Sequence, residues 1–330
     1  MTAARLLAAG VVIAALLAHS SQTVLAQDAS TYYTVMHPEQ FKTDWAGFYR
    51  QADARTAAVR AQVRHTLDIP YGADVKQRLD IYYPDAKRDA TQNPKRVQAP
   101  RARAPVFLFL HGGGFREGDR AQYGFVAKPF ADHGVISVIA SYRLTGGGFS
   151  YPAQRDDARL AVLWLYHHIA RYGGDPERIY IGGHSSGAIL AADLGVDLGW
   201  LEHEGVPKRV LRAIVPISAP YDLRTPANPV EPNVFWSGYT PSAQTRAEAS
   251  PSLHILDPVA AALVVAGSTE NEGYDDYVGS SKDFVAELAA HGVQAQFLSL
   301  PGAGHRDTVW ALGDADSVLF PAVLRLINGP

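Results

Sequence analysis

Short apolar runs alternate with segments of helical periodicity along most of the chain. The runs are rich in β-branched and aromatic residues and are bounded by glycine, proline or polar residues, which is typical of buried strands. Apolar strands separated by helices favour a mainly parallel sheet with helices on both faces. The predicted strands are residues 78–83, 106–110, 135–141, 178–181, 211–218, 262–266 and 295–300.

Helical spacing of apolar residues predicts the intervening helices. One runs from Pro152 to about residue 172 and places Leu160, Leu163 and Trp164 on one face. Others are predicted at 188–194 and 281–291. A further helix at about 44–64 carries an apolar face of Trp45, Phe48, Tyr49, Ala52, Val59 and Val63. This helix either packs on the main domain or covers the mouth of the active site.

The first 26 residues have the pattern of a secretory signal. Arg5 precedes an apolar run at 6–18, and small residues end at Ala26, where cleavage would leave Gln27 first. The run is shorter than the roughly 20 residues that span a bilayer, although an uncleaved anchor is the alternative. We therefore predict a signal peptide at 1–26, a helical segment and possible cap at 27–65, and an α/β domain at 66–330, exported to the periplasm or secreted, with no stable membrane insertion after cleavage.

Composition narrows the function classes. A formal charge of −3 gives no electrostatic case for a nucleic acid partner. With no cysteine, the chain has neither disulfides nor a thiolate metal site. Its histidines lack the spacing of a zinc helix, so neither a metal nor another cofactor is expected. The cationic loop at 85–105 is either solvated or a docking surface.

A GxSxG motif lies at 183–187, between a predicted strand and a predicted helix. In that context the serine stands on a sharp turn in a strained and exposed conformation. Gly183 and Gly187 would allow the close approach of the strand and helix backbones. Ser185 is therefore the candidate nucleophile.

A glycine loop follows the strand at 106–110 with the sequence HGGGF at 111–115. Such a loop supplies main-chain donors to the oxyanion that forms in acyl transfer. We assign this role to the N–H groups of Gly113, Gly114 and Ser186, and expect a side chain at Gly113 to block the substrate. His111 is expected to brace the loop by hydrogen bonding.

A base and an acid follow the last two predicted strands. His305 could take the serine proton, because histidine is the side chain that most often acts as a general base near neutral pH. Among four acids after residue 266, Glu270 is preferred because it lies three residues past Gly267, where the chain turns toward the histidine loop. The others, Glu272, Asp275 and Asp276, are alternatives, or else a solvated turn or a helix cap.

Several side chains near these motifs are candidates for contact with the substrate. They are Phe115, His184, Trp236 and Tyr239. The aromatic residues of 221–253 could equally be plain packing under a loop.

The motifs together resemble the α/β-hydrolase superfamily, in particular the hormone-sensitive-lipase-like carboxylesterases and the kynurenine formamidase-like branch. HGGGF at 111–115 resembles the esterases, whereas His184 before the nucleophile resembles the formamidases. The chain order of Ser185, Glu270 and His305 is also that of the superfamily. The sequence departs from many relatives at two positions, because it has glutamate at 270 and serine at 186.

The resemblance implies hydrolysis of esters or acyl amides through an acyl-enzyme. The leading hypothesis is an exported serine hydrolase of short-chain or aromatic carboxylic esters. An arylformamidase or other amidase is the alternative within the same chemistry. A non-catalytic scaffold of the same fold, acting as a binding protein, is the alternative from another class. For both enzymes the expected partner is a small-molecule ester or acyl amide.

Overall fold

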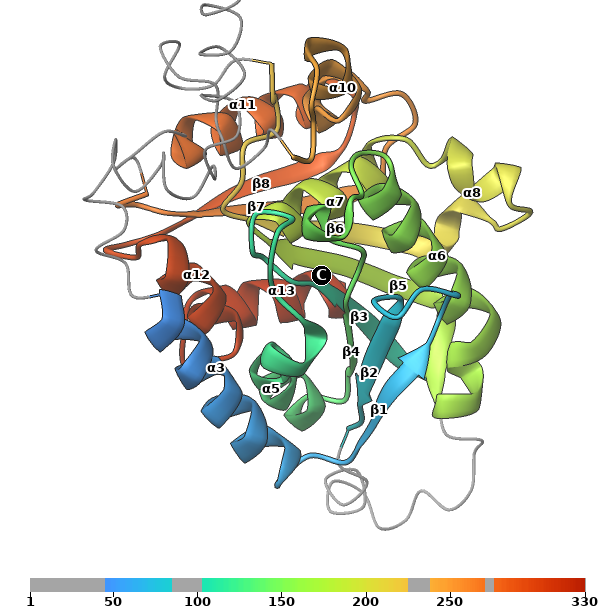
Figure 1. The fold of residues 1–330 in the computed structure, drawn as a ribbon, viewed down its shortest axis with the longest axis vertical. Helices are drawn as coiled ribbons and strands as arrows, with labels where there is room; N and C mark the ends of the chain where they lie inside the picture. Colours follow the sequence, from blue (N-terminus) through green and yellow to red (C-terminus); the bar gives the residue numbers. More distant parts are fainter. Residues whose placement is uncertain (1–44, 85–102, 225–237, 271–275, 330) are drawn as a thin grey trace, which may run out of the picture. The chain divides into compact units, whose positions relative to one another are not determined.

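A computed structural model describes residues 45–84, 103–224, 238–270 and 276–329. The signal segment at 1–26, most of the loop predicted at 85–105, and the candidates Trp236, Glu272 and Asp275 lie outside these ranges. The described residues form an eight-stranded sheet covered by helices (Figure 1). The strands are β1 His65–Pro70, β2 Arg78–Tyr82, β3 Ala104–Leu110, β4 Ile136–Ala140, β5 Gly174–His184, β6 Leu211–Ile217, β7 Ala261–Gly267 and β8 Gln294–Leu300.

The sheet is mainly parallel, as predicted. Its order is β1-β2-β4-β3-β5-β6-β7-β8, with β2 antiparallel to both β1 and β4 and every later pair parallel. All seven predicted strands are present. Strand β1 was missed because its residues alternate between half-buried and exposed, and polar His65 and Asp68 interrupt the apolar signal. It pairs with β2 alone at one edge.

Helices cover both faces because successive side chains of a strand point to opposite sides. In β3, Val106 and Leu108 belong to the core formed with α6 and α7. Phe107 between them stacks on Phe130 of α5, with ring centroids 4.5 Å apart, and Phe130 meets Phe320 of α13. The helices are α3 Trp45–Arg60, α5 Ala127–Asp132, α6 Ala153–His168, α7 Ser186–Val196, α8 Gly199–His203, α10 Ala243–Glu248, α11 Tyr277–Ala290, α12 His305–Leu312 and α13 Leu319–Asn328 (Figure 1).

In the parts of the chain just delimited, no helix combines the length and the apolar character needed to cross a membrane.

The buried face of α6 differs from the prediction. Leu160 is 38% exposed, whereas the small residues Ala158 and Ala161 are fully buried together with Val162 and Leu165. Helix α7, against which α6 packs, is itself built mainly from alanine, glycine and leucine. Small side chains let two helices approach closely, so the contact face is not the one with the largest apolar residues.

Helix α3 packs through the residues its periodicity predicted. Phe48, Ala52 and Val59 are buried, and the Phe48 ring lies 4.8 Å from that of Trp310 on α12. Thr56, on the same face, donates a hydrogen bond from Oγ1 to the carbonyl of Gln122 at 2.8 Å. The helix is thus attached to α12 and to the segment after the glycine loop. Its role as a cap stays a prediction.

A buried carboxylate links the start of the domain to that same segment. Asp80 on β2 accepts hydrogen bonds from Arg60 of α3 and Arg120, each at 3.0 Å, and from the main-chain N–H of Asp68 at 2.8 Å. It is 1% exposed. A charge so buried is stable only while its partners remain, and here it has them on three separate elements.

Replacing Asp80 by alanine is therefore expected to lower the free energy of unfolding by about 3 kcal/mol, because Arg60 and Arg120 lose a shared partner in a partly buried site. Urea unfolding followed by circular dichroism measures the change. The matched control is Asp132→Ala, which removes a half-exposed pair with Lys128 on α5 and should cost less than about 1 kcal/mol. Equal losses in the two variants would contradict this account of Asp80.

Candidate active site

Ser185 occupies the sharp turn between β5 and α7. Its backbone has φ 54° and ψ −120°, a conformation that residues other than glycine rarely adopt. The main-chain N–H of Ser185 donates to the carbonyl of Ile217 on β6 at 2.9 Å, which holds the turn against the neighbouring strand. Local strain of this kind persists only where the surroundings enforce it.

The two glycines of the motif stand where no side chain has room. A Cβ atom on Gly183 would overlap the carbonyl group of Gly187, and one on Gly187 would overlap the carbonyl oxygens of Leu110 and His111. The nucleophile turn is therefore pressed against the end of β3. This agrees with the close backbone approach expected from the sequence.

The glycine loop begins beside the nucleophile. A Cβ on Gly112 would lie 3.3 Å from Cβ of Ser185 and 2.8 Å from Nδ1 of His184. Gly113 has a φ of 127°, and its carbonyl accepts hydrogen bonds from the N–H groups of Arg116 and Glu117 at 3.0 and 3.1 Å. A side chain at Gly113 would meet the Glu117 carbonyl of its own loop. The loop itself therefore requires glycine at position 113, whether or not a substrate is bound.

The donors assigned to the oxyanion are available for a ligand. Within the described ranges, the main-chain N–H groups of Gly113, Gly114 and Ser186 donate to no other group. Ser186 is also the first residue of α7, where the helix dipole adds positive potential. Free donors beside a nucleophile are what a developing oxyanion requires.

His111 makes the hydrogen bond expected of a brace. It is fully buried, its Nδ1 lies 2.8 Å from the carbonyl of Gly112, and its ring stacks on Tyr142 at 4.4 Å. The Tyr142 hydroxyl donates to the His111 carbonyl at 2.7 Å. Burial lowers the pKa of His111 to about 4, so the imidazole is neutral at pH 7.

His305 and Glu270 meet at the carboxyl ends of β8 and β7. His305 is the first residue of α12, and its Nδ1–H donates to Oε1 of Glu270 at 2.9 Å. Oε2 of the same carboxylate accepts from the N–H of Gly267 at 2.6 Å and from the hydroxyl of Ser218 at 2.9 Å. The Glu270 side chain is fully buried, and that of His305 is 23% exposed. A buried, fully bonded carboxylate thus orients a partly open imidazole.

Of the candidate acids that the structure describes, Glu270 contacts the histidine and Asp276 does not. Asp276 is exposed, and its Oδ1 accepts from the N–H of Gly279 at 2.7 Å, so it caps the start of α11. Capping was the alternative role considered for the acids of this segment. Glu272 and Asp275 lie outside the described residues.

His184 connects the nucleophile turn to the base. Its Nε2 lies 2.8 Å from the main-chain carbonyl oxygen of His305, and the two rings have centroids 4.6 Å apart. The Tyr277 ring, at the start of α11, also stacks on His305 at 5.0 Å with an interplanar angle of 16°. Ser185 and His305 are 120 positions apart in the chain. Both therefore lie at the carboxyl ends of the parallel strands, with His184 between their loops.

Three residues of this arrangement were not anticipated from the sequence. They are Ser218, Tyr277 and Thr308, whose Oγ1 lies 2.9 Å from the Ser218 hydroxyl oxygen. Ser218 directly follows the buried strand β6 and has a φ of 58°. A polar residue at the end of a central parallel strand was the available signal, because all such ends share one edge. Tyr277 and Thr308 carried no signal of their own, since their places depend on how α11 and α12 turn.

The remaining candidates for substrate contact pack mainly with each other. Phe115 and Tyr239 are fully buried and stacked, with centroids 3.6 Å apart, and Tyr151 meets Tyr239 edge-on at 5.6 Å. His184 directs Nε2 at the histidine loop. Trp236 lies outside the described residues. Contact of these side chains with a substrate stays a prediction.

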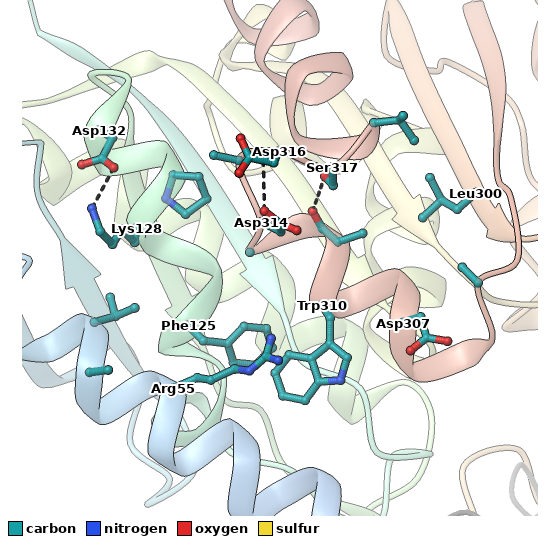
Figure 2. Close-up of a pocket in the computed structure, with 18 of the residues that line it drawn as sticks. Arg55, Phe125, Lys128, Asp132, Leu300, Asp307, Trp310, Asp314, Asp316 and Ser317 are labelled. Carbon is teal, nitrogen blue, oxygen red and sulfur yellow. Dashed lines mark hydrogen bonds and ion pairs between the residues drawn. The ribbon is translucent and has the colours of Figure 1, made fainter.

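A separate open groove of about 1030 Å³ lies between α3, α5, α12 and the connection that precedes α13 (Figure 2). Its lining includes Phe125 and Trp310, and the Arg55 guanidinium lies 4.2 Å over the Trp310 ring. Neither Ser185 nor Glu270 lines it. Among the residues that the structure describes, no group of three or more histidine and acidic side chains could hold a metal ion.

Comparisons with known proteins show similarity to esterases and to a formamidase. Residues 77–196 match the model of the carboxylesterase family. The chain is 25% identical to esterase LipC of Mycobacterium tuberculosis over 285 residues, which cover 82% of this chain and 67% of that protein. It is 22% identical to kynurenine formamidase of Danio rerio over 277 residues, covering 83% of this chain and 85% of that protein.

Solved structures show the same architecture. The crystal structure of esterase B from Lactobacillus rhamnosis, inhibited by a tributyrin phosphonate, superposes with a TM-score of 0.68 at 19% identity, covering 89% of this chain and 94% of that one. The fold is that of the α/β-hydrolases, which confirms the predicted fold class. Within this fold, residues 77–196 are the part of the chain that is similar to the carboxylesterase family.

The buried His111 predicts a pH dependence of stability. Its pKa is about 4 in the folded chain and 6.5 ordinarily, so between these values the unfolded chain binds a proton that the folded chain does not. Above pH 6.5 this group does not lower the free energy of unfolding. As the pH falls from 6.5 to 4, its protonation in the unfolded chain lowers the free energy of unfolding by up to about 3 kcal/mol.

His111→Asn removes this titration, so its stability should fall less steeply than that of the wild type between pH 6.5 and 4. The comparison with a variant is needed because burial raises the pKa of Asp193 to about 6, which acts in the opposite direction. Urea unfolding at several pH values gives both slopes. Identical slopes would show that His111 does not titrate as described.

Proposed function

We propose that this protein cleaves short-chain or aromatic carboxylic esters through an acyl-enzyme on Ser185. The observation that carries the proposal is the hydrogen bond of His305 to the buried Glu270 at 2.9 Å, on the sheet edge where the strained Ser185 stands. A serine hydroxyl is a poor nucleophile and needs a base held in one orientation.

In the first half of the reaction, Oγ of Ser185 attacks the carbonyl carbon of the ester while Nε2 of His305 takes its proton. The negative charge moves to the carbonyl oxygen, which the N–H groups of Gly113, Gly114 and Ser186 would stabilise. When the tetrahedral intermediate collapses, the bond to the leaving alcohol breaks and the imidazolium gives the alcohol its proton. An acyl group then remains on Ser185.

In the second half, water replaces the alcohol. His305 takes a proton from the water as its oxygen attacks the acyl carbon, and the proton then passes to Oγ of Ser185 as the carboxylic acid leaves. Glu270 fixes the tautomer with Nδ1–H and stabilises the imidazolium that forms twice in the cycle.

Two relatives support the ester as substrate. One is named an esterase, LipC, and esterase B was solved with a tributyrin phosphonate, which carries short acyl chains.

Arylformamide hydrolysis is the second candidate. The kynurenine formamidase of Danio rerio is covered over 85% of its length, and histidine stands before the nucleophile at position 184. The same Ser185, His305 and Glu270 chemistry would cleave a formamide, with an amine in place of the alcohol as leaving group.

One set of assays tests the proposal. The wild type is expected to hydrolyse p-nitrophenyl acetate and butyrate faster than the octanoate, and faster than N-formylkynurenine. Ser185→Ala should lower kcat by at least about 10⁴-fold and Glu270→Gln by about 10³- to 10⁴-fold. Asp276→Asn, a capping acid in the same segment, is the control and should leave kcat within about twofold.

The outcomes separate the hypotheses. Formamide turnover far above that of every ester would assign the second function. Equal rates for the wild type and Ser185→Ala would remove Ser185 as nucleophile, and the absence of turnover on all substrates would favour a non-catalytic binding protein.

We also propose that the protein is exported. The support is the sequence pattern of residues 1–26, with one cation, an apolar run and small residues before Gln27. Expression with the full leader in a bacterial host should release a mature chain that begins at Gln27, which N-terminal sequencing of the periplasmic or secreted fraction would show. A membrane-bound chain that retains Arg5 would instead indicate an uncleaved anchor.

A further inference from the structure

We propose that His184 is a positioning residue, which holds the base on the nucleophile turn by donating Nε2–H to the main-chain carbonyl of His305. The inference rests on the proposed serine-hydrolase function and goes beyond it, because it concerns how the base is kept within reach of the serine. His184 precedes the nucleophile directly, so its backbone is part of the same strained turn.

The contacts of His184 place it between three loops. Nε2 lies 2.8 Å from the His305 carbonyl oxygen, and its ring lies 4.6 Å from the His305 ring. On the glycine loop, a Cβ at Gly112 would come within 2.8 Å of Nδ1. The side chain is 2% exposed. A single buried imidazole thus contacts the base loop and the glycine loop from the turn that carries the nucleophile.

The chemistry of the bond fixes the tautomer. A carbonyl oxygen only accepts, so Nε2 must carry the hydrogen, and Nδ1 has no partner among the described residues. Burial holds the pKa of His184 well below its ordinary value, which keeps the imidazole neutral. A neutral donor positions His305 without placing a second positive charge beside the imidazolium that forms in catalysis.

A second donor to the same carbonyl provides an internal comparison. Oγ1 of Thr308 donates to the His305 carbonyl at 2.8 Å, but it lies three residues away in the same helix. That bond moves with α12 and cannot fix the helix relative to the serine. The bond from His184 joins residues 121 positions apart and ties α12 to the nucleophile turn.

The base is consequently held at two points. Glu270 fixes the imidazole through Nδ1, and His184 fixes the main chain of the same residue. Ser218 connects the first of these anchors to α12, because its hydroxyl lies 2.9 Å from both Oε2 of Glu270 and Oγ1 of Thr308. Without His184, Glu270 would still select the tautomer, but α12 could shift, and a misplacement of about 1 Å can cost roughly 100-fold in rate.

Two substitutions at position 184 test the proposal. His184→Phe keeps a planar ring and removes the donor, so kcat for p-nitrophenyl butyrate should fall about 10- to 100-fold with KM within about threefold. His184→Gln keeps an N–H at the position of Nε2 and should restore kcat to within about fivefold of the wild type. His133→Phe is the matched control, because it removes another imidazole hydrogen bond to a main-chain carbonyl, that of Pro129 at 2.7 Å, away from the site; kcat should stay within about twofold.

The ratio of kcat between the two His184 variants should be the same for an ester and for a formamide. It is therefore measured with the substrate that the wild type hydrolyses. Should His184→Phe not fold, His184→Asn replaces it, because the shorter amide cannot reach the carbonyl. A Gln variant as slow as the Phe or Asn variant overturns the proposal. So does a rise in KM with kcat unchanged, which would make His184 a substrate contact.

Discussion

The contact between the nucleophile turn and the end of β3 is the constraint on which the site depends. Neither Gly183 nor Gly187 has space for a Cβ atom, because carbonyl groups of Gly187, Leu110 and His111 fill it. This approach sets the glycine loop beside Ser185 and leaves the N–H of Gly113, Gly114 and Ser186 without other partners in the described structure. The parallel pairing of β3 with β5 maintains it across the sheet.

Around this contact, buried hydrogen bonds fix the orientation of the loops, because apolar packing is not directional. Asp80 fixes α3 and the segment after the glycine loop, His111 fixes the loop itself, and Glu270 fixes the base. All three side chains are almost fully buried; Asp80 and Glu270 bond to separate elements, whereas His111 bonds within its own loop. Hydrophobic burial provides most of the stability of such a domain, whereas these bonds select one relative placement of the loops.

The sequence predicted the parallel sheet and the loops that carry Ser185, Glu270 and His305, because strand ends and glycine turns leave local patterns. It did not predict β1, whose polar residues interrupt the apolar signal, or the buried face of α6, which is formed mainly by small residues. Ser218 was missed although its place at the end of β6 was an available signal, whereas Thr308 and the bond of His184 were out of reach. They depend on how α7 and α12 lie across the sheet, which no spacing along the chain encodes.

Strand β8 lies at the edge of the sheet and pairs only with β7. His305 follows that strand, whereas Ser185 follows β5 in the interior of the sheet. Fraying of the edge would therefore carry away the proton acceptor and leave the hydroxyl in place. Loss of turnover should therefore precede loss of the helical circular dichroism signal on heating. Activity would then measure whether β8 is still paired with the sheet.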